Sequence, residues 1–133
     1  MPLARQILHN SGEYIHIAVW PTVNEMHQIA SRHYAFEGRC FVLAAGLLMR
    51  VEDLPSQLPA IPELDGKSDH LLLRGGSAII GPDGQYIVEP VFDEERIIIA
   101  ELDLTAIDKE RMTLDVSGHY QRADLFDLSL KSN

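Results

Sequence analysis

The sequence predicts an α/β fold, on three observations. Residues 14–20 (YIHIAVW) are rich in β-branched and aromatic residues, which favours a strand. Residues 40–48 (CFVLAAGLL) are continuously apolar, which is typical of a strand buried on both faces. The segment between them has apolar residues at steps of three and four, which indicates a helix. Strand, helix and strand in this order predict a crossover unit with the helix lying on a sheet.

Local signals predict where the first elements begin and end. Residues 2–11 are expected to form a short helix that stops at Gly12. Thr22 is expected to cap the second helix, with Glu25 as its partner in a capping box. Gly38 is expected to end that helix just before the second strand.

The middle of the chain changes character. Residues 51–76 hold several prolines and glycines with acidic residues between them, which predicts a long irregular surface segment. The Pro-Asp-Gly sequence at 82–84 is a strong turn signal, so residues 77–80 and 85–88 are expected to pair as a hairpin.

The last third of the chain is predicted to hold one more strand and one more helix. Residues 96–102 (RIIIAEL) are expected to form a strand, and residues 105–114 a short helix capped by Thr105. Residues 116–133 are predicted to be an extended tail that is either frayed or docked on a partner. The whole chain, 1–133, is expected to be one domain with about six strands and three helices divided between two sheets.

Composition excludes several classes of function. Twenty acidic residues stand against 11 basic ones, a net charge of −9, which disfavours binding to nucleic acid or to an anionic membrane surface. We see no apolar stretch near the ~18 residues that a membrane span needs, and no signal peptide in the first ten residues. One cysteine allows no internal disulfide, so we expect a cytoplasmic protein.

Cys40 is the one cysteine and therefore the first candidate nucleophile. A reactive thiol needs a helix N-terminus, a nearby cation or a histidine base. Arg39 is adjacent, but neighbours on a strand point to opposite faces, and the residues after Cys40 are typical of a core. We therefore expect Cys40 to be structural.

The other candidate residues also favour structural roles. The six histidines are scattered without ligand spacing, so no metal site is expected, and no cofactor. Arg32 and Glu37 lie five residues apart near the end of the second helix; a general base there is conceivable, but we interpret both as structural hydrogen-bonding groups. Residues 75–77 lack the spacing of a phosphate-binding loop.

Four blocks of the sequence, taken in order, carry a resemblance to a known family. They are HIAVWPT, RHYAFEGRCFVLAAG, GGSAIIGPDGQYIVEP and GHYQRADLFDLSL, at residues 16–22, 32–46, 75–90 and 118–130. Together they resemble the C-terminal half of nitrilases, the nitrile-cleaving branch of the carbon–nitrogen hydrolases. The resemblance implies a partial α–β–β–α sandwich, about half of the family domain. It also implies that tail 116–133 takes part in oligomerisation, as in nitrilases that form spirals.

The resemblance implies hydrolysis of a nitrile to a carboxylic acid and ammonia. In the family, a cysteine forms a thioester, a glutamate acts as general base, and a lysine stabilises the intermediate. The family's Cys-Trp-Glu segment does not occur in this chain, so we carry over no catalytic residue and expect no activity from the chain alone. Met1 is then expected to be an internal methionine of a longer protein. The resemblance places Trp20 and Pro21 at the border of the substrate pocket; packing of Trp20 in the core is the equal alternative.

Three hypotheses about function remain open. The first is a nitrilase fragment that self-associates or complements the missing N-terminal half. The second is a non-catalytic interaction protein that associates with a full-length nitrilase. The third is a small independent enzyme that uses Cys40, and it requires that Cys40→Ala abolish activity.

Overall fold

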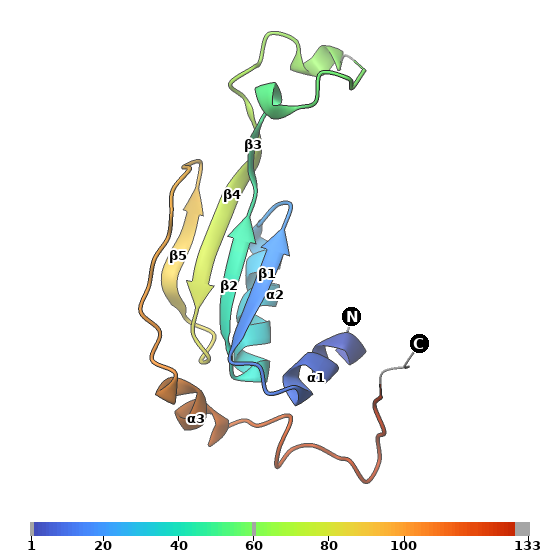
Figure 1. Cartoon of the computed structure of the whole chain (residues 1–133), viewed down its shortest axis with the longest axis vertical. Helices are drawn as coiled ribbons and strands as arrows, with labels where there is room; N and C mark the ends of the chain where they lie inside the picture. The colour runs from blue at the N-terminus through green and yellow to red at the C-terminus, as the bar shows by residue number, and fades with distance from the viewer. Residues whose placement is uncertain (1, 60, 130–133) are drawn as a thin grey trace.

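One sheet of five strands forms the body of the protein, and a long helix lies across it (Figure 1). The computed structural model describes residues 2–59 and 61–129. In chain order, the elements are α1 (Pro2–Asn10), β1 (Ile15–Trp20), α2 (Glu25–Gly38), β2 (Phe41–Gly46), β3 (Leu48–Arg50), two short 3-10 turns (Val51–Asp53 and Pro62–Leu64), β4 (Leu71–Ile80), β5 (Tyr86–Phe92) and α3 (Thr105–Arg111).

The predicted crossover unit is confirmed. β1 and β2 are parallel, with Ile15 opposite Phe41 and Trp20 opposite Gly46, and α2 connects them. β4 runs antiparallel to β2, β3 and β5. The predicted division into two sheets is wrong, because β2 and β3 follow one another along the same side of β4. Leu47 interrupts them, and its carbonyl accepts a hydrogen bond from the backbone N–H of Gly75 at 3.1 Å.

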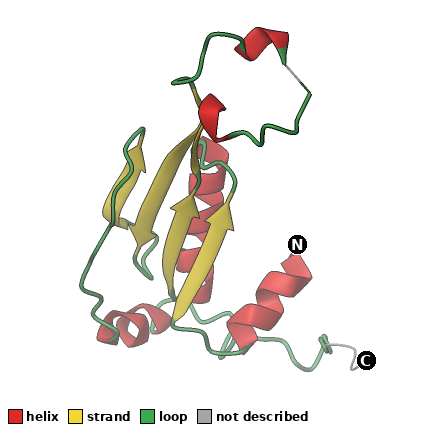
Figure 2. Ribbon diagram, turned by 45° about the horizontal axis from the view of Figure 1, so that its top comes forward, coloured by secondary structure: helices red, strands yellow, loops and turns green. Residues whose placement is uncertain are grey.

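α2 covers one face of the sheet and creates the core there (Figure 2). The buried side chains of this core come from α2, from the two central strands and from the link between α2 and β2, and they are Ala35, Cys40, Val42, Ala44 and Ile80. Ala18, Trp20, Tyr34 and Tyr86 pack around them. The continuously apolar run predicted as a strand is therefore the centre of the molecule, as expected for a strand covered by a crossover helix.

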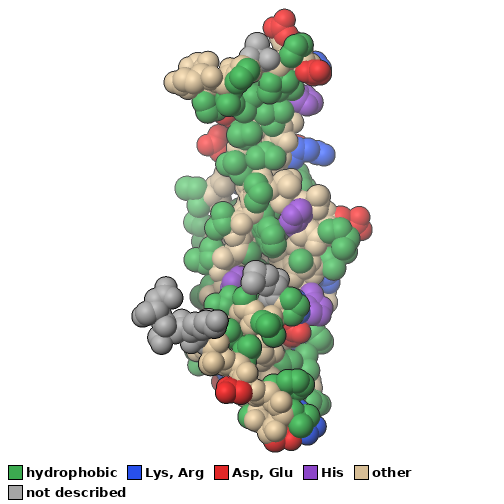
Figure 3. Space-filling model, turned by 90° about the vertical axis from the view of Figure 1, so that its right-hand side faces the viewer, with side chains coloured by type: hydrophobic (Ala, Val, Ile, Leu, Met, Phe, Trp, Pro, Cys, Tyr) green, Lys and Arg blue, Asp and Glu red, His purple; other side chains and the backbone are tan. Residues whose placement is uncertain are grey.

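The opposite face of the sheet is apolar but uncovered. Ala18 and Trp20 of β1 pack toward α2, and because side chains alternate across a strand, Ile15, Ile17 and Val19 point away from α2. Ile15, Ile17 and Val19 are 43%, 66% and 77% exposed. Figure 3 shows hydrophobic side chains along much of the side of the molecule that carries β1.

The predicted strand at 96–102 is wrong. The segment leaves β5 and runs back beside that strand to α3 without forming a strand (Figure 1). Ile97 and Ile99 are 88% and 86% exposed. Its β-branched residues fit a strand, but a strand needs the backbone of a partner, and none pairs with it in the described part of the chain. The expected six strands are therefore five among the described residues.

Two predicted helix caps are also wrong. α2 begins at Glu25 after Asn24, and no side chain caps it, so the Thr22–Glu25 capping box does not form. At α3, Asp103 takes the role expected of Thr105. Its Oδ1 accepts hydrogen bonds from the backbone N–H and the hydroxyl of Thr105 at 3.0 and 2.7 Å.

The irregular segments agree in part with the prediction. Residues 51–59 and 61–70 form loop segments with two short 3-10 turns that project beyond the end of the sheet (Figure 1), but β4 begins earlier than expected, at Leu71. The tail has no helix or strand over residues 116–129, and its last four residues, 130–133, lie outside the described residues. Across the described ranges, none of the helices is long and apolar enough to span a membrane.

Candidate functional site

Trp20 and Pro21, the two residues expected at the substrate pocket, lie at the end of β1 but differ in environment. The indole of Trp20 packs beneath α2, where its Nε1–H donates to the hydroxyl of Ser31 at 3.2 Å. The ring of His27 meets it edge-on at 4.9 Å. Pro21 is exposed. The structure therefore places the Trp20 side chain between α2 and the sheet, and leaves Pro21 as the surface residue of the pair.

A cavity of about 680 Å³ lies beside this strand end. Gly46, which pairs with Trp20, lines it together with Ser77. The Ser77 hydroxyl accepts a hydrogen bond from the Gly46 N–H at 3.0 Å. The remaining wall combines apolar side chains with four carboxylates and two guanidinium groups, from Glu52, Asp53, Glu94, Glu95, Arg50 and Arg96. The lining contains no cysteine, so this cavity alone cannot supply a thiol nucleophile.

Cys40 lies in the core, as the sequence predicts. Its side chain is fully buried between α2 and β2. Burial, with a smaller contribution from the nearby Glu13 carboxylate and a still smaller opposing effect of Arg111, raises the pKa of the Cys40 thiol to about 12. The thiolate is the reactive form of cysteine, so Cys40 is inert near neutral pH.

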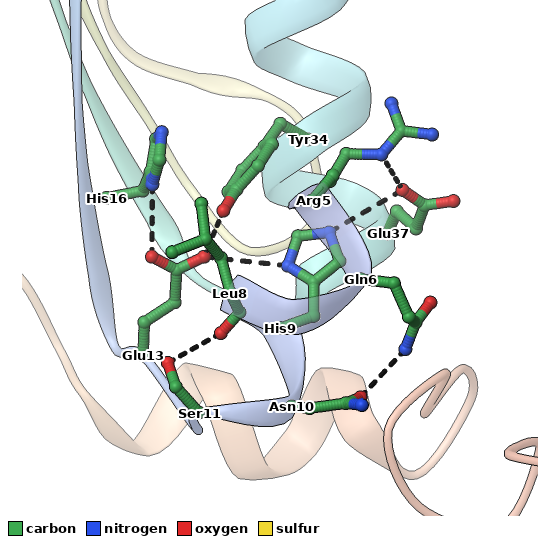
Figure 4. Close-up of polar contacts among 10 residues, drawn as sticks. All are labelled: Arg5, Gln6, Leu8, His9, Asn10, Ser11, Glu13, His16, Tyr34 and Glu37. Atoms are coloured by element: carbon green, nitrogen blue, oxygen red, sulfur yellow. Dashed lines mark hydrogen bonds and ion pairs between the residues drawn. The ribbon is translucent and has the colours of Figure 1, made fainter. Parts of the chain in front are cut away.

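A polar cluster lies where α1 meets α2 and the start of β1 (Figure 4). On one side, the Arg5 guanidinium pairs with the Glu37 carboxylate at 2.7 Å. On the other side, the Glu13 carboxylate accepts a short hydrogen bond from the Tyr34 hydroxyl and lies 3.0 Å from Nδ1 of His16. Burial, with help from Glu13, raises the pKa of Tyr34, so the phenol keeps its proton and acts as a donor.

His9 lies between the two halves of this cluster. Its Nδ1 is 3.5 Å from Glu13 Oε1, and its Nε2 is 3.5 Å from Glu37 Oε2 (Figure 4). The imidazole is almost completely buried, and neither nitrogen makes a hydrogen bond. Burial lowers the pKa of His9, although the two carboxylates oppose that effect. The sequence did not single out this cluster, because its members are spread over more than thirty positions and match no motif.

Arg32 and Glu37 both make polar contacts with other elements, but they do not pair with each other. Arg32 donates from Nε to the carbonyl of Gly84 at 2.7 Å and so ties α2 to the β4–β5 turn. Glu37 instead pairs with Arg5 of α1.

Arg39 is a further key residue that the sequence did not predict. It is 3% exposed and has a left-handed backbone conformation, with φ of 49°, at the end of α2. Its guanidinium donates to the carbonyls of Leu114 and Pro82 at 3.2 and 3.0 Å. It also donates to Glu110 and to Thr113, each at 3.2 Å. Arg39 thereby joins the end of α2 to the hairpin turn and to the segment around α3.

Within the described residues, no three His, Cys, Asp or Glu side chains are close enough together to hold a metal ion. Two places bring acidic side chains together: the polar cluster around His9 and the carboxylates of the 680 Å³ cavity. Both also contain arginine guanidinium groups. A nearby cation opposes the binding of another cation.

Comparison with known proteins identifies the family. The family model for carbon-nitrogen hydrolases matches residues 1–111. The chain is 35% identical over 131 residues to an arylacetonitrilase of Trametes versicolor, across 98% of this chain and 41% of that protein. It is 34% identical over 136 residues to a bifunctional nitrilase/nitrile hydratase of Lupinus angustifolius, across 100% of this chain and 39% of that protein. The chain therefore belongs to the carbon-nitrogen hydrolase family.

The fold agrees with this assignment. The crystal structure of a carbon-nitrogen hydrolase from Helicobacter pylori superposes with a TM-score of 0.68 at 20% sequence identity, over 93% of this chain and 43% of that one. The α/β class is thus confirmed. The chain spans about two fifths of the length of the relatives that it matches.

Proposed function

We propose that this chain is the C-terminal portion of a nitrile-hydrolysing enzyme and that it has no hydrolytic activity alone. The observation that carries the proposal is the state of Cys40. A thioester mechanism needs a thiolate, and the one cysteine of the chain is fully buried with its pKa raised to about 12. The names of the relatives, an arylacetonitrilase and a nitrilase/nitrile hydratase, support a nitrile as the substrate class.

In this proposal, the chain supplies the framework of the site and the nucleophile comes from elsewhere. The end of β1, with Trp20 and the exposed Pro21, adjoins the cavity lined by Gly46 and Ser77. Ligands in open α/β folds collect at such strand ends. A single buried cysteine, which allows no internal disulfide, agrees with the expected cytoplasmic location.

The expected partner covers the open face of the sheet. Ile15, Ile17 and Val19 form an exposed apolar row, and apolar surface of this kind is typical of an interface. A complementing N-terminal nitrilase segment fits this face, and a second copy of the chain is the alternative when that segment is absent. The tail, residues 116–133, is proposed to add to the oligomer contacts.

The test measures ammonia released from aliphatic and arylacetic nitriles. The chain alone and its Cys40→Ala variant are both expected to release none. Mixing the chain with a separately expressed N-terminal segment of an arylacetonitrilase is expected to restore release. The Cys40→Ala chain is expected to regain the same ammonia release after mixing. The Ile17→Lys chain is expected to regain none, because a charge would interrupt the exposed apolar row of β1. Ammonia from the unmixed chain that disappears in Cys40→Ala would refute the proposal.

A second candidate is a non-catalytic protein that associates with a full-length nitrilase. The same exposed row on β1 favours it, because a full-length enzyme also offers apolar interfaces. Co-elution of the chain with an intact nitrilase, combined with no restoration of activity by the N-terminal segment, would select this candidate over the first.

A further inference from the structure

The buried contact of α1 with the rest of the protein is made by a histidine. Of the nine residues of α1, His9 alone is buried. Leu3 and Leu8, two of the large apolar residues of this helix, are 69% and 42% exposed. Burial of apolar side chains normally holds a surface helix in place. In α1, the buried side chain is instead the titratable imidazole of His9.

The site around His9 fits the ring closely. Its imidazole packs against the Tyr34 ring with a centroid distance of 4.5 Å. Gly38 forms the other side of the site, since a Cβ at this position would lie 2.4 Å from two ring atoms. A glycine is therefore required where α2 ends, and the fit leaves little room for the ring to move away from the carboxylates.

Neither neighbouring carboxylate is free to balance a charge on this ring. Glu37 has a closer partner in Arg5, at 2.7 Å compared with 3.5 Å to His9. Glu13 has closer partners in Tyr34 and His16. A neutral imidazole has no charge to satisfy, so it tolerates this arrangement, whereas an imidazolium would be a further buried cation.

Charged groups also lie on the remaining side of His9. A cavity of about 250 Å³ beside His9 is lined by Arg39, Arg111 and Asp115 from the end of α2, α3 and the segment after it. Around the ring lie the guanidinium groups of Arg5, Arg39 and Arg111 and the carboxylates of Glu13, Glu37 and Asp115, and Arg39 is itself paired with Glu110 at 3.2 Å. His16 on β1 and the phenol of Tyr34 on α2 complete the titratable surroundings. The two carboxylates nearest to the His9 ring, Glu13 and Glu37, are thus each engaged by closer partners.

We propose that His9 is a pH-sensitive latch that holds α1 against α2 while its imidazole is neutral and releases α1 when the imidazole gains a proton. The inference rests on the packing of α1 and is independent of the proposed function. Its test has no activity readout, so the two can fail separately.

The direction of the pH dependence follows from burial. In the docked helix, burial lowers the pKa of His9 below its ordinary value of 6.5, and release of the helix returns the ring to water. The docking of α1 is therefore strongest above the ordinary pKa of 6.5, and it is lost as the pH falls through the lowered pKa of the docked His9. Between the two values, the equilibrium constant for opening rises by at most about tenfold for each pH unit.

Amide hydrogen exchange measures the release directly. Exchange rates of the α1 amides, corrected for intrinsic chemistry and referred to the β2 amides of the same molecule, are compared between about pH 7.5 and pH 5. Protection of α1 is expected to fall several-fold in the wild-type chain. His9→Phe, which keeps a flat ring beside Tyr34 and Gly38, is expected to abolish that fall, and His9→Gln serves as a second variant without a titratable group. His33→Phe, on the exposed side of α2, is the matched control and is expected to behave as wild type.

An NMR titration of the His9 ring in the wild-type chain completes the test and does not depend on how the variants fold. A midpoint below 6.5 is expected. A midpoint at or above 6.5, α1 protection that rises on acidification, or a pH response that persists in both His9→Phe and His9→Gln would overturn the proposal.

Discussion

Replacing Arg39 with methionine is expected to lower the free energy of unfolding by about 3–5 kcal/mol. Arg39 is 3% exposed, and its guanidinium donates four hydrogen bonds to groups that lie far away in sequence. Methionine keeps most of the apolar stem and removes every donor. The carbonyls of Leu114 and Pro82 lose their partner, and so does the Glu110 carboxylate.

The expected loss of unfolding free energy balances the number of hydrogen bonds removed against the water that their former partners regain. Four hydrogen bonds from a charged donor, at about 1.5–3 kcal/mol each, would give more than the stability of many domains if they were additive. They are not additive, because the Glu110 side chain is 35% exposed and recovers water when Arg39 is lost. The guanidinium also lies 4.2 Å from the centre of the Phe36 ring, a cation–π contact of about 0.5–1 kcal/mol or more. A net loss of about 3–5 kcal/mol is the expected balance.

Urea unfolding followed by circular dichroism measures the loss, at one fixed protein concentration. In a separate thermal unfolding experiment, the melting temperature of Arg39→Met is expected to lie roughly 10–20 °C below that of the wild type. Arg96→Met is the matched control, because Arg96 is half-exposed and its ion pair with Glu94 is 3.5 Å long. A surface pair of this kind contributes about 0–1 kcal/mol. If the free energies of unfolding of Arg39→Met and Arg96→Met differ by less than about 1 kcal/mol, Arg39 does not hold α2, the hairpin turn and the segment around α3 together.

Three further predictions follow from the core and from one close backbone contact. Phe41→Ala, at 2% exposure, is expected to destabilise the protein by about 3–5 kcal/mol in urea unfolding, while Phe126→Ala, at 74% exposure, is expected to change it by less than about 0.5 kcal/mol. With its pKa raised from 9.0 to about 12, Cys40 is expected to react with iodoacetamide near pH 8 at least about 1,000-fold more slowly than after unfolding; equal rates would contradict its burial. Gly46→Ala is expected to prevent stable folding, because its Cβ would lie 2.1 Å from a backbone oxygen of β4; a thermal unfolding transition near that of wild type would contradict this.

Features of the fold that depend on neighbouring residues were predictable from the sequence. The helix at the start of the chain, the strand before Trp20 and the apolar strand after Cys40 all occur where the local patterns placed them. The turn at 82–84 also forms, and Gly84 N donates to the Gly81 carbonyl at 2.9 Å. These features are set by side-chain periodicity and turn chemistry over a few residues, so one sequence is enough to predict them.

Features that depend on distant residues were not predictable in this way. Residues 96–102 have the composition of a strand, but pairing depends on a partner backbone that no local pattern reveals. Arg39 bonds with residues 43 to 75 positions away, and nothing near it in sequence distinguishes it from a solvated arginine. His9 belongs to the same class, because burial depends on Gly38 and Tyr34, which come from another helix.

The two faces of β1 join these observations to the proposed function. Its α2-facing residues, Ala18 and Trp20, are packed, and the alternate residues Ile17 and Val19 are equally apolar yet exposed. A strand that needed only one covered face would place polar residues at those positions, since sheets with one wet face alternate apolar and polar side chains. A sequence that is apolar on both faces is suited to a second layer, as in the sandwich that the resemblance implies. The uncovered face leads to the expectation that a further polypeptide layer covers the open side of the sheet, and the buried thiol of Cys40 agrees with the proposal that any nucleophile comes from outside this chain.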